Sequence, residues 1–205
     1  MEEKENNNKK KKKVIDIILD FVLVILIIVC ALSIYFKLSF VKVVVNGESM
    51  TPNIQDGSKG YMQKVRANTK IERFDVVTGT YDSKADYYII KRVLGLPGEN
   101  VTLKSNKLYI NDEEVEQTFN FNKRIFDFQT TSWTLGDDEY LLVGDNRAGT
   151  IEPVVEKKEN ITAKNGFSYA IYDVNASSCK ASSDYSSCPI KSRGWYWFKE
   201  GINNW

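Results

Sequence analysis

The sequence predicts a mainly β, antiparallel, barrel-like domain that follows a single membrane-spanning helix. Three observations carry this prediction: one apolar run near the start of the chain, many short segments with period-two alternation after it, and frequent turn residues between those segments. Few segments after the run have the period of a long amphipathic helix, and no internal repeat is present. We therefore expect an open or barrel-like antiparallel sheet.

The N-terminal part of the chain divides into a charged tail and an apolar span. Residues 1–13 end in five consecutive lysines, and we expect this tail to be disordered and solvated. Residues 14–36 form the apolar run, which at 23 residues is long enough to cross a hydrocarbon core as a helix. Its only charges, Asp16 and Asp20, lie in its first two turns, so the stretch from 21 to 32 is fully apolar.

The lysines on the N-terminal side of the span predict its orientation. By the positive-inside rule the tail stays in the cytoplasm and residues 37–205 form an extracytoplasmic domain beside the membrane lipid. Two alternatives remain open. The first is that the apolar run is a cleavable signal peptide, for which Ala31-Leu32-Ser33 supplies a small-x-small cleavage triplet. Against this alternative, apolar residues continue past the triplet to Phe36. The lysine run also suits nucleic acid, but it lies beside an apolar span and is more typical of a topology signal.

Charge and composition exclude several classes of function. The chain has a net charge of +1, and its first 36 residues hold six lysines against three Glu and two Asp, so residues 37–205 are neutral. We therefore expect no nucleic-acid partner. The chain contains no histidine, which removes histidine-based serine or cysteine nucleophiles and histidine-ligated zinc. The 169 residues after the span are ample for a core.

The expected strands follow one another along the outer domain. Alternating or β-branched segments predict strands at residues 40–45, 61–65, 75–80, 87–93, 100–103, 107–110, 140–143, 167–174 and 195–198. The fifth and sixth form a hairpin around a polar turn, and the last two form a final pair. The segment 115–138 is the least regular, and its aromatic residues suit either a flap that touches the membrane or extra strands with buried rings.

Two features of the C-terminal part leave alternatives open. Cys179 and Cys188 flank a Ser-rich loop. Either the two cysteines form a disulfide that closes this loop, or both are free thiols. An aromatic group comprises Trp195, Tyr196, Trp197 and Trp205. We expect most of this group in a core strand, with anchoring at the membrane interface as the alternative.

Ser49 is the first candidate for chemistry. It lies after a strand, in a turn that Gly47 and Pro52 punctuate, and such a turn exposes a hydroxyl. Gly47 leaves backbone room for a substrate carbonyl, and the Ser49 amide can contribute to an oxyanion hole. A serine in a turn of this kind is most often only a turn residue.

Lys91 is the second candidate, because its neighbours on both sides form a largely apolar strand. Desolvation disfavours a charged ammonium and lowers the pKa of a lysine from about 10.4 toward the range that a general base needs. With no histidine in the chain, a neutral lysine is the base that remains for a serine nucleophile. The alternative is a lysine whose amine extends to solvent from a strand edge.

Four blocks, in this order, carry a resemblance to a known family. They are Ser49-Met50-x-Pro52, Arg73-Phe74-Asp75-Val76-Val77 against a family pattern R-G-D-x-V, Lys91-Arg92-Val93-x-Gly95-x-Pro97-Gly98, and Gly144-Asp145-Asn146-Arg147. With these blocks the chain resembles the bacterial type I signal peptidases, also called leader peptidases, of the Gram-positive kind with one N-terminal anchor. The ordered set is more specific than any single block.

The resemblance implies a role for each matched residue. Ser49 is the nucleophile and Lys91 the base, while Gly47, Met50 and Pro52 shape the turn around the serine. Arg92, Asp145 and Asn146 support the site, with Arg92 and Asp145 as an ion pair or as ordinary structural charges. Thr150 and Glu152 stand where the family has a hydroxyl and a carboxylate that orient the lysine. The chain departs from the family at Pro153 and Val154, where a serine and an arginine are usual.

The implied activity is a membrane-bound Ser/Lys endopeptidase of the bacterial cytoplasmic membrane that removes signal peptides from exported preproteins. Small residues are expected at substrate positions −1 and −3, with the substrate bound as an extended strand. We expect no cofactor and no metal. The alternative is a catalytically weak relative that binds exported proteins as an accessory factor, which the departure at Pro153 favours and the intact Ser49 and Lys91 disfavour.

Overall fold

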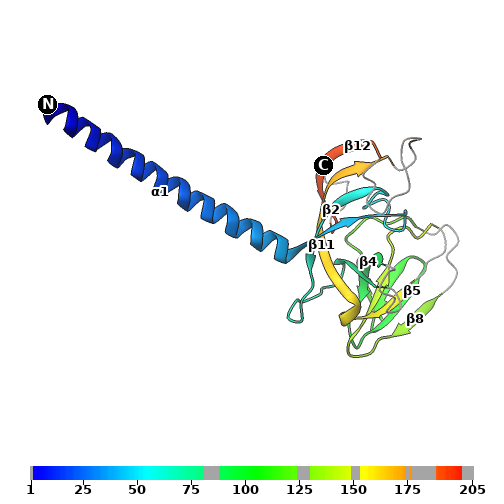
Figure 1. Ribbon diagram of the computed structural model, residues 1–205. Coiled ribbons are helices and arrows are strands. Elements are labelled where there is room, and N and C mark those ends of the chain that lie inside the picture. Colours follow the sequence, from blue (N-terminus) through cyan, green and yellow to red (C-terminus); the bar gives the residue numbers. More distant parts are fainter. Residues whose placement is uncertain are drawn as a thin grey trace. The chain divides into compact units, whose positions relative to one another are not determined.

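The computed structural model of the protein describes residues 2–80, 88–123, 130–148, 153–173, 176 and 188–199, with side chains from residue 12 onward. The chain divides into two units, Met1–Phe40 and Val41–Trp205, which we call the helical unit and the β unit (Figure 1). The family-implied Thr150 and Glu152, together with Cys179, Trp205 and the aromatic residues 126 and 128, lie outside the described residues.

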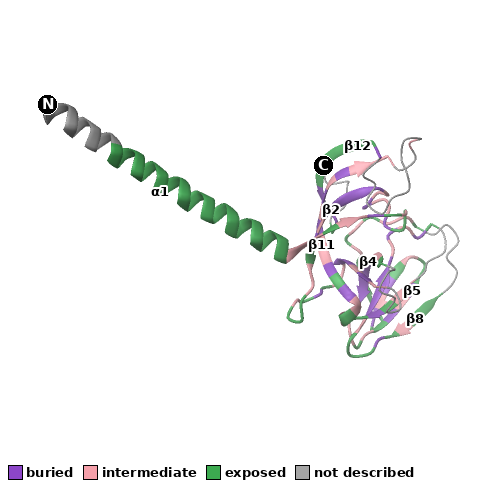
Figure 2. Ribbon diagram, in the orientation of Figure 1, coloured by how far each residue is buried: buried purple, intermediate pink, exposed green. Residues whose placement is uncertain are grey.

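The helical unit is one helix, α1 (Glu2–Ser39). Its segment Lys12–Ser39 is long and apolar enough to cross a membrane, and its described side chains are almost all exposed (Figure 2). The predicted apolar span at 14–36 lies within this helix. The expectation of a disordered tail was wrong, because α1 already begins at Glu2. Extending an existing helix costs little, and lysine and glutamate are good helix formers.

The β unit contains two antiparallel sheets, and the predicted mainly β fold is confirmed. The larger sheet has the order β1-β2-β11-β3-β4-β9-β10, with β12 paired to β11. Its strands are β1 (Phe40–Val44), β2 (Ser58–Lys64), β3 (Val76–Thr80), β4 (Tyr88–Gly95), β9 (Glu139–Val143), β10 (Val154–Lys157), β11 (Ile161–Tyr172) and β12 (Ile190–Trp197). The smaller sheet has the order β7-β6-β5-β8 and comprises β5 (Asn100–Lys104), β6 (Lys107–Ile110), β7 (Glu113–Val115) and β8 (Thr131–Thr134).

β11 organises the larger sheet, because it pairs with three other strands. It is antiparallel to β2, β3 and β12, and the register shifts along each of these pairings. Such bulges bend a strand, and β11 curves across the unit in Figure 1. A short 3-10 helix, η1 (Lys158–Asn160), leads into β11.

All nine predicted strands are present, with ends shifted by a few residues. The predicted hairpin pairs β5 with β6 through a turn at Ser105 and Asn106, both with positive φ, and the predicted final pair is β11 with β12. Three strands were not predicted: β7, β8 and β10. They have three or four residues each, too few to display a period of two.

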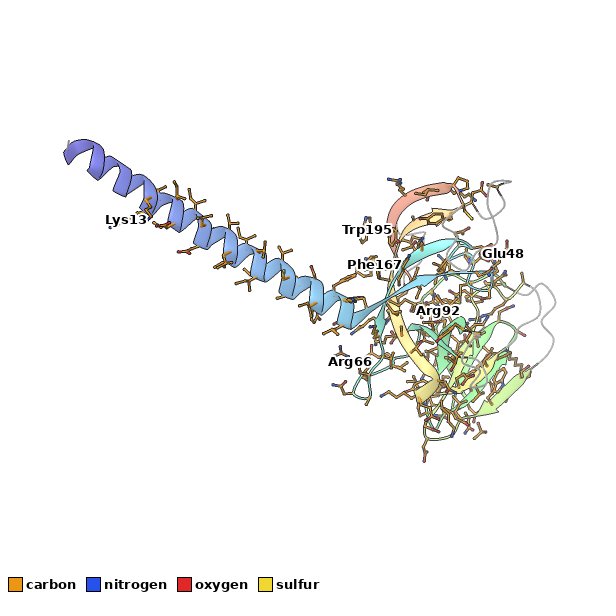
Figure 3. The ribbon with its side chains drawn as sticks, viewed as in Figure 1. Lys13, Glu48, Arg66, Arg92, Phe167 and Trp195 are labelled. Carbon is orange, nitrogen blue, oxygen red and sulfur yellow. The ribbon has the colours of Figure 1, made fainter. Side chains whose placement is uncertain are left out.

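β12 corrects one expectation about the aromatic residues. Tyr196 is buried in the core, but Trp195 and Trp197 are 67% and 58% exposed, so the expected core role was wrong for these two. Successive side chains of a strand point to opposite faces, and only Tyr196 points inward. Trp195 lies against Phe167 of β11, with ring centroids 4.9 Å apart, at the border of the β unit (Figure 3). In the same region, Cys188 is disulfide-bonded.

Three apolar clusters hold the β unit together. One of them contains Met50 and Ile54, which follow Ser49 closely in sequence, packed with Val45, Met62 and Val76. Both Met50 and Ile54 have no exposed surface. Burying a side chain of this size contributes about 1.5–3 kcal/mol, so the turn that bears Ser49 is anchored in the core by its own sequence.

Candidate active site

The serine turn, residues 47–54, lies in the connection between β1 and β2. The backbone N–H and the Oγ1 hydroxyl of Thr51 both donate to the Glu48 carbonyl, at 3.1 and 3.0 Å, and the Ile54 N–H donates to Met50 O at 2.9 Å. Ser49 itself is exposed. The buried Met50 therefore fixes the turn while the hydroxyl next to it faces solvent.

Gly47 supplies the conformation with which this turn begins. Its φ is +102°, a region that side-chain-bearing residues rarely adopt. A Cβ at this position would meet no atom within 4 Å, so the space beside Gly47 is open. The Gly47 N–H donates to the Asp56 carboxylate at 2.9 Å. Pro52 follows in the turn and is half-buried.

Lys91 lies in the middle of β4, opposite Val77 of β3. It is half-buried, whereas the four residues after it, 92 to 95, are fully buried. Ser49 and Lys91 line the same cavity, which has a volume of about 700 Å³. Residues 41–45 of the β1 segment form one wall of this cavity, and Met62, Thr78 and Ile90 are among its other lining residues.

Gly144 marks the point where the serine turn and the lysine converge. A Cβ built on Gly144 would lie 2.4 Å from the Ser49 carbonyl oxygen and 3.6 Å from Lys91 Nζ. The first distance is too short for any real Cβ contact, because a backbone atom stands there. Only glycine permits this approach, so the backbone of Ser49 and the amine of Lys91 come within a few ångströms of one point.

The loop 144–147, which we call the Gly-Asp-Asn loop, holds the serine turn through Asn146. The Asn146 N–H donates to Ser49 O at 3.0 Å, and its side-chain Nδ2 donates to Glu48 O at 3.2 Å. Two successive carbonyls of the turn are thus fixed by one residue. Sequence reasoning placed Asn146 in the site, and the structure brings it to the serine.

Arg92, the residue after Lys91 in β4, forms a buried ion pair with Asp145. Arg92 Nε and Nη2 donate to the two carboxylate oxygens of Asp145 at 2.8 and 2.6 Å, and the two side chains are 1% and 0% exposed. The second guanidinium edge donates to Phe74 O at 2.9 Å and Lys199 O at 3.1 Å. A buried pair is retained only with such full hydrogen bonding, because removal of either partner leaves an uncompensated charge.

Asn53 was not predicted to take part in the site. Its Nδ2 donates to Asp145 at 2.7 Å and to the Asn120 carbonyl at 2.5 Å. It therefore connects the far end of the serine turn to the ion pair. No sequence signal distinguished it, because asparagine is ordinary in a turn.

Residues 117–122, which we call the strap, contain the second group that sequence reasoning missed. The Phe119 ring lies 4.2 Å from the Arg92 guanidinium and 5.3 Å, between centroids, from the ring of Phe74. Arg147 lies 4.2 Å from the ring of Phe121, and its Nη1 donates to Gln117 Oε1 at 2.8 Å. These residues belong to the segment 115–138, whose described part contains an extra strand, β8, while the rings of Phe119, Phe121 and Trp133 are only half-buried.

Arg147 is buried, and burial lowers its pKa to about 10, although Asp145 acts in the opposite direction and Arg92 adds to the lowering. The residue remains charged at neutral pH. The carboxylate of Asp145 and the guanidinium of Arg147, both on the Gly-Asp-Asn loop, therefore lie near the guanidinium of Arg92, with the ring of Phe119 against Arg92 and that of Phe121 against Arg147.

Phe74 stands where the family pattern has glycine, and its backbone shows why glycine is usual. Its φ is +69°, which is strained for an aromatic residue and costs about 1–3 kcal/mol. The ring packs on Phe119, and the carbonyl accepts from Arg92. The contact with the strap thus offsets part of the strain.

The described residues include no group of three or more Cys, Asp or Glu side chains placed to hold a metal ion. The chemistry available at this cavity is that of an exposed serine, a half-buried lysine and the backbone around them.

Comparison with known proteins identifies the family. Residues 18–151 match the family described as signal peptidase, peptidase S26, and the chain belongs to it. The match includes Ser49, Lys91 and the Gly-Asp-Asn loop and ends before β11 and β12. The resemblance inferred from the four sequence blocks is therefore confirmed.

Individual relatives agree with this assignment. The chain is 29% identical to signal peptidase I U of Bacillus subtilis (strain 168) over 138 residues, which cover 62% of this chain and 72% of the relative. It is 30% identical to a signal peptidase I of Bacillus amyloliquefaciens over 144 residues, 66% and 76% of the two chains. It is also similar to a crystal structure of a signal peptidase I from Enterococcus faecalis V583, at 23% identity and a TM-score of 0.39, over 46% of this chain and 96% of that one.

Proposed function

We propose that this protein is a membrane-anchored serine endopeptidase that removes signal peptides from exported preproteins, with Ser49 as nucleophile and Lys91 as general base. The observation that carries the proposal is that Ser49 and Lys91 line one cavity, with Gly144 leaving room for both. Membership of the signal peptidase family and the signal peptidase I names of its relatives support the same activity.

The proposed reaction needs only groups of this cavity. Neutral Lys91 takes the proton of the Ser49 hydroxyl as its oxygen attacks the scissile carbonyl. The Ser49 N–H stabilises the negative charge that develops on the carbonyl oxygen. Protonated Lys91 then delivers the proton to the leaving amine, and water releases the acyl group from Ser49. Asn146, Arg92 and Asp145 keep the serine turn and β4 in place. Thr150 and Glu152 are proposed, from the family pattern, to orient the lysine.

The proposed substrate is an extended peptide bound beside β1. Residues 41–45 form a wall of the cavity, and an exposed strand edge binds an extended chain through its main-chain groups. The lining is mixed, and its apolar residues, among them Val41, Val43, Met62 and Ile90, suit the small apolar side chains expected at positions −1 and −3.

Helix α1 is the proposed single-pass anchor in the bacterial cytoplasmic membrane. Its apolar segment is long enough to span, and the lysines before it favour a cytoplasmic N-terminus with the β unit outside. A tethered peptidase meets membrane-bound preproteins at a raised effective concentration. The charged tail 1–13, the span 14–36 and the catalytic part 37–205 follow from this arrangement.

The proposal is tested with purified full-length protein in detergent and a preprotein that carries a signal peptide. Ser49→Ala and Lys91→Met are expected to lower kcat/KM by at least about a thousandfold, because each removes a group that acts on the reacting atoms. The matched controls are Ser132→Ala and Lys104→Met, which replace the same residue types on the smaller sheet.

Equal processing by wild type, Ser49→Ala and Lys91→Met would overturn the assignment of both residues. If wild type leaves the preprotein intact where a signal peptidase I processes it, the second candidate replaces the first. That candidate is an accessory protein that binds exported proteins, and the altered residues Pro153 and Val154 favour it.

A further inference from the structure

The strap crosses the Gly-Asp-Asn loop and pairs with it at one point. The Asn122 N–H donates to Asp145 O at 3.0 Å, and the Arg147 N–H donates to Asn122 O at 3.1 Å. Asn122 and Asn146 are thereby partners in an isolated parallel β-bridge. A residue of the strap is thus in strand-like contact with the residue that holds the serine turn.

The side chains of these two asparagines are also in contact. Asn122 Nδ2 donates to Asn146 Oδ1 at 3.2 Å, while Asn146 Nδ2 donates to Glu48 O at 3.2 Å. A primary amide has one end that only accepts and one that only donates. If the Asn146 amide turned over, its oxygen would face the Glu48 carbonyl oxygen and the bond to the turn would become a repulsion. The donor on Asn122 selects the orientation that holds the turn.

We propose that Asn122 is a positioning residue for the nucleophile: its side-chain amide fixes the side-chain amide of Asn146, which donates to the carbonyl of the peptide bond between Glu48 and Ser49. This inference rests on the proposed role of Ser49. Asn122 lines no part of the catalytic cavity and acts on the reaction only through Asn146.

The strap can do this because it is itself held firmly. Phe119 lies against both the Arg92 guanidinium and the ring of Phe74, and Asn53 donates to the Asn120 carbonyl. Arg147 adds a hydrogen bond to Gln117. A donor on a fixed segment loses little conformational entropy when it bonds, so Asn122 can impose an orientation on its partner.

The test compares Asn122→Asp with Asn120→Asp. An aspartate at 122 has the shape of asparagine but no donor, so Asn146 would turn its Nδ2 toward it and release Glu48. Asn120 is exposed on the same strap and uses only its backbone carbonyl in the described contacts, so its replacement adds the same charge and leaves the Asn122 donor in place. We expect Asn122→Asp to lower kcat for preprotein cleavage by about tenfold or more with KM within about twofold, and Asn120→Asp to change neither.

A double-mutant cycle shows whether Asn122 acts through Asn146. In an Asn146→Ala background, Asn122→Asp is expected to cause no further loss of kcat, because no amide remains to be oriented. Thermal unfolding of each variant accompanies the kinetics. Should Asn122→Asp fail to fold, Asn122→Ala against Asn120→Ala gives the same comparison without an added charge.

Three outcomes would overturn the inference. They are equal kcat for Asn122→Asp and Asn120→Asp, the same fold-loss from Asn122→Asp with and without Asn146, and a loss that appears in KM alone. Failure of the proposed function would look different, since Ser49→Ala would then cleave as well as wild type.

Discussion

Two carboxylates of the β unit, Asp145 and Asp75, are equally buried but are held by different partners. Asp145 meets the flat guanidinium of Arg92 through two parallel hydrogen bonds and the amide of Asn53 through a third. Asp75 meets the ammonium groups of Lys164 and Lys199 at 2.8 and 3.0 Å, together with the amide of Asn165. Each carboxylate has a full set of donors, as burial requires.

The difference lies in the elements that the donors come from. Asn53 belongs to the serine turn and Arg92 follows Lys91, so the bonds of Asp145 end in the proposed catalytic site. Lys164 and Asn165 belong to β11, and the Asn165 side chain also accepts from the Val76 N–H at the start of β3. Asp75 therefore connects β11 to the start of β3 in the larger sheet. Burial alone does not distinguish the two carboxylates; the residues that donate to them do.

The largest effect is expected from Asp145→Asn. The change leaves the buried Arg92 charge without its counter-ion and turns an amide toward a guanidinium, which should lower the free energy of unfolding by about 3–5 kcal/mol. It also replaces one acceptor oxygen with an N–H₂ group, so a donor of Arg92 or Asn53 loses its partner and kcat should fall in the protein that remains folded. Urea unfolding and preprotein cleavage measure the two effects. A variant with unchanged kcat would show that the ion pair serves the fold alone.

Asp75→Asn should affect stability without affecting catalysis. Burial opposes ionisation of Asp75, but hydrogen bonds from Lys164, Asn165, the Glu72 backbone and Lys199 outweigh it and hold its pKa below the ordinary value. We expect a loss of about 2–3 kcal/mol at neutral pH and unchanged kcat.

The pH dependence of this loss has a defined sign. Because the folded-state pKa is lowered, the stabilising contribution is present above the unfolded pKa of about 3.9 and is lost as pH falls through the folded value. The difference between wild type and Asp75→Asn in urea unfolding should therefore shrink as the pH falls below about 4. A difference that grows with acid would contradict this account.

The smallest effect is expected at the pair of Lys107 and Glu114 on the smaller sheet. The two side chains are 56% and 50% exposed, and their charged groups lie 2.8 Å apart. The hydrogen bond that Lys107 donates to Glu114 raises the pKa of Lys107, but water and salt screen an exposed pair. Lys107→Met should leave the unfolding midpoint and kcat indistinguishable from those of wild type. A clear loss there would mean that exposure is a poor guide to the strength of ion pairs in this protein.

The sequence predicted the longer strands and the residues of the ordered motifs, because their patterns extend over several residues. A largely apolar, β-branched run marks β4, and alternating large apolar residues mark β11. The four ordered blocks identified Ser49, Lys91, Arg92, Asp145 and Asn146 as candidates. The short strands β7 and β8 display no period, and the exposure of Trp195 and Trp197 depends on which strand becomes an edge.

The positioning contacts could not have been found from the sequence. Asn53 and Asp145 are 92 positions apart, and Asn122 and Asn146 are 24 apart. Both asparagines missed by sequence reasoning, Asn53 and Asn122, lie among residues typical of turns, where an amide carries no particular signal. Their part in the site follows only from folding, which brings the strap, the serine turn and the Gly-Asp-Asn loop together.

Gly144 restricts the gene as well as the protein. Every missense change of a glycine codon introduces a residue with a Cβ, since glycine alone lacks that atom. At position 144 the new atom would stand 2.4 Å from the carbonyl oxygen of Ser49. The codon can therefore vary silently, but any change that alters the amino acid must shift the Gly-Asp-Asn loop or the serine turn.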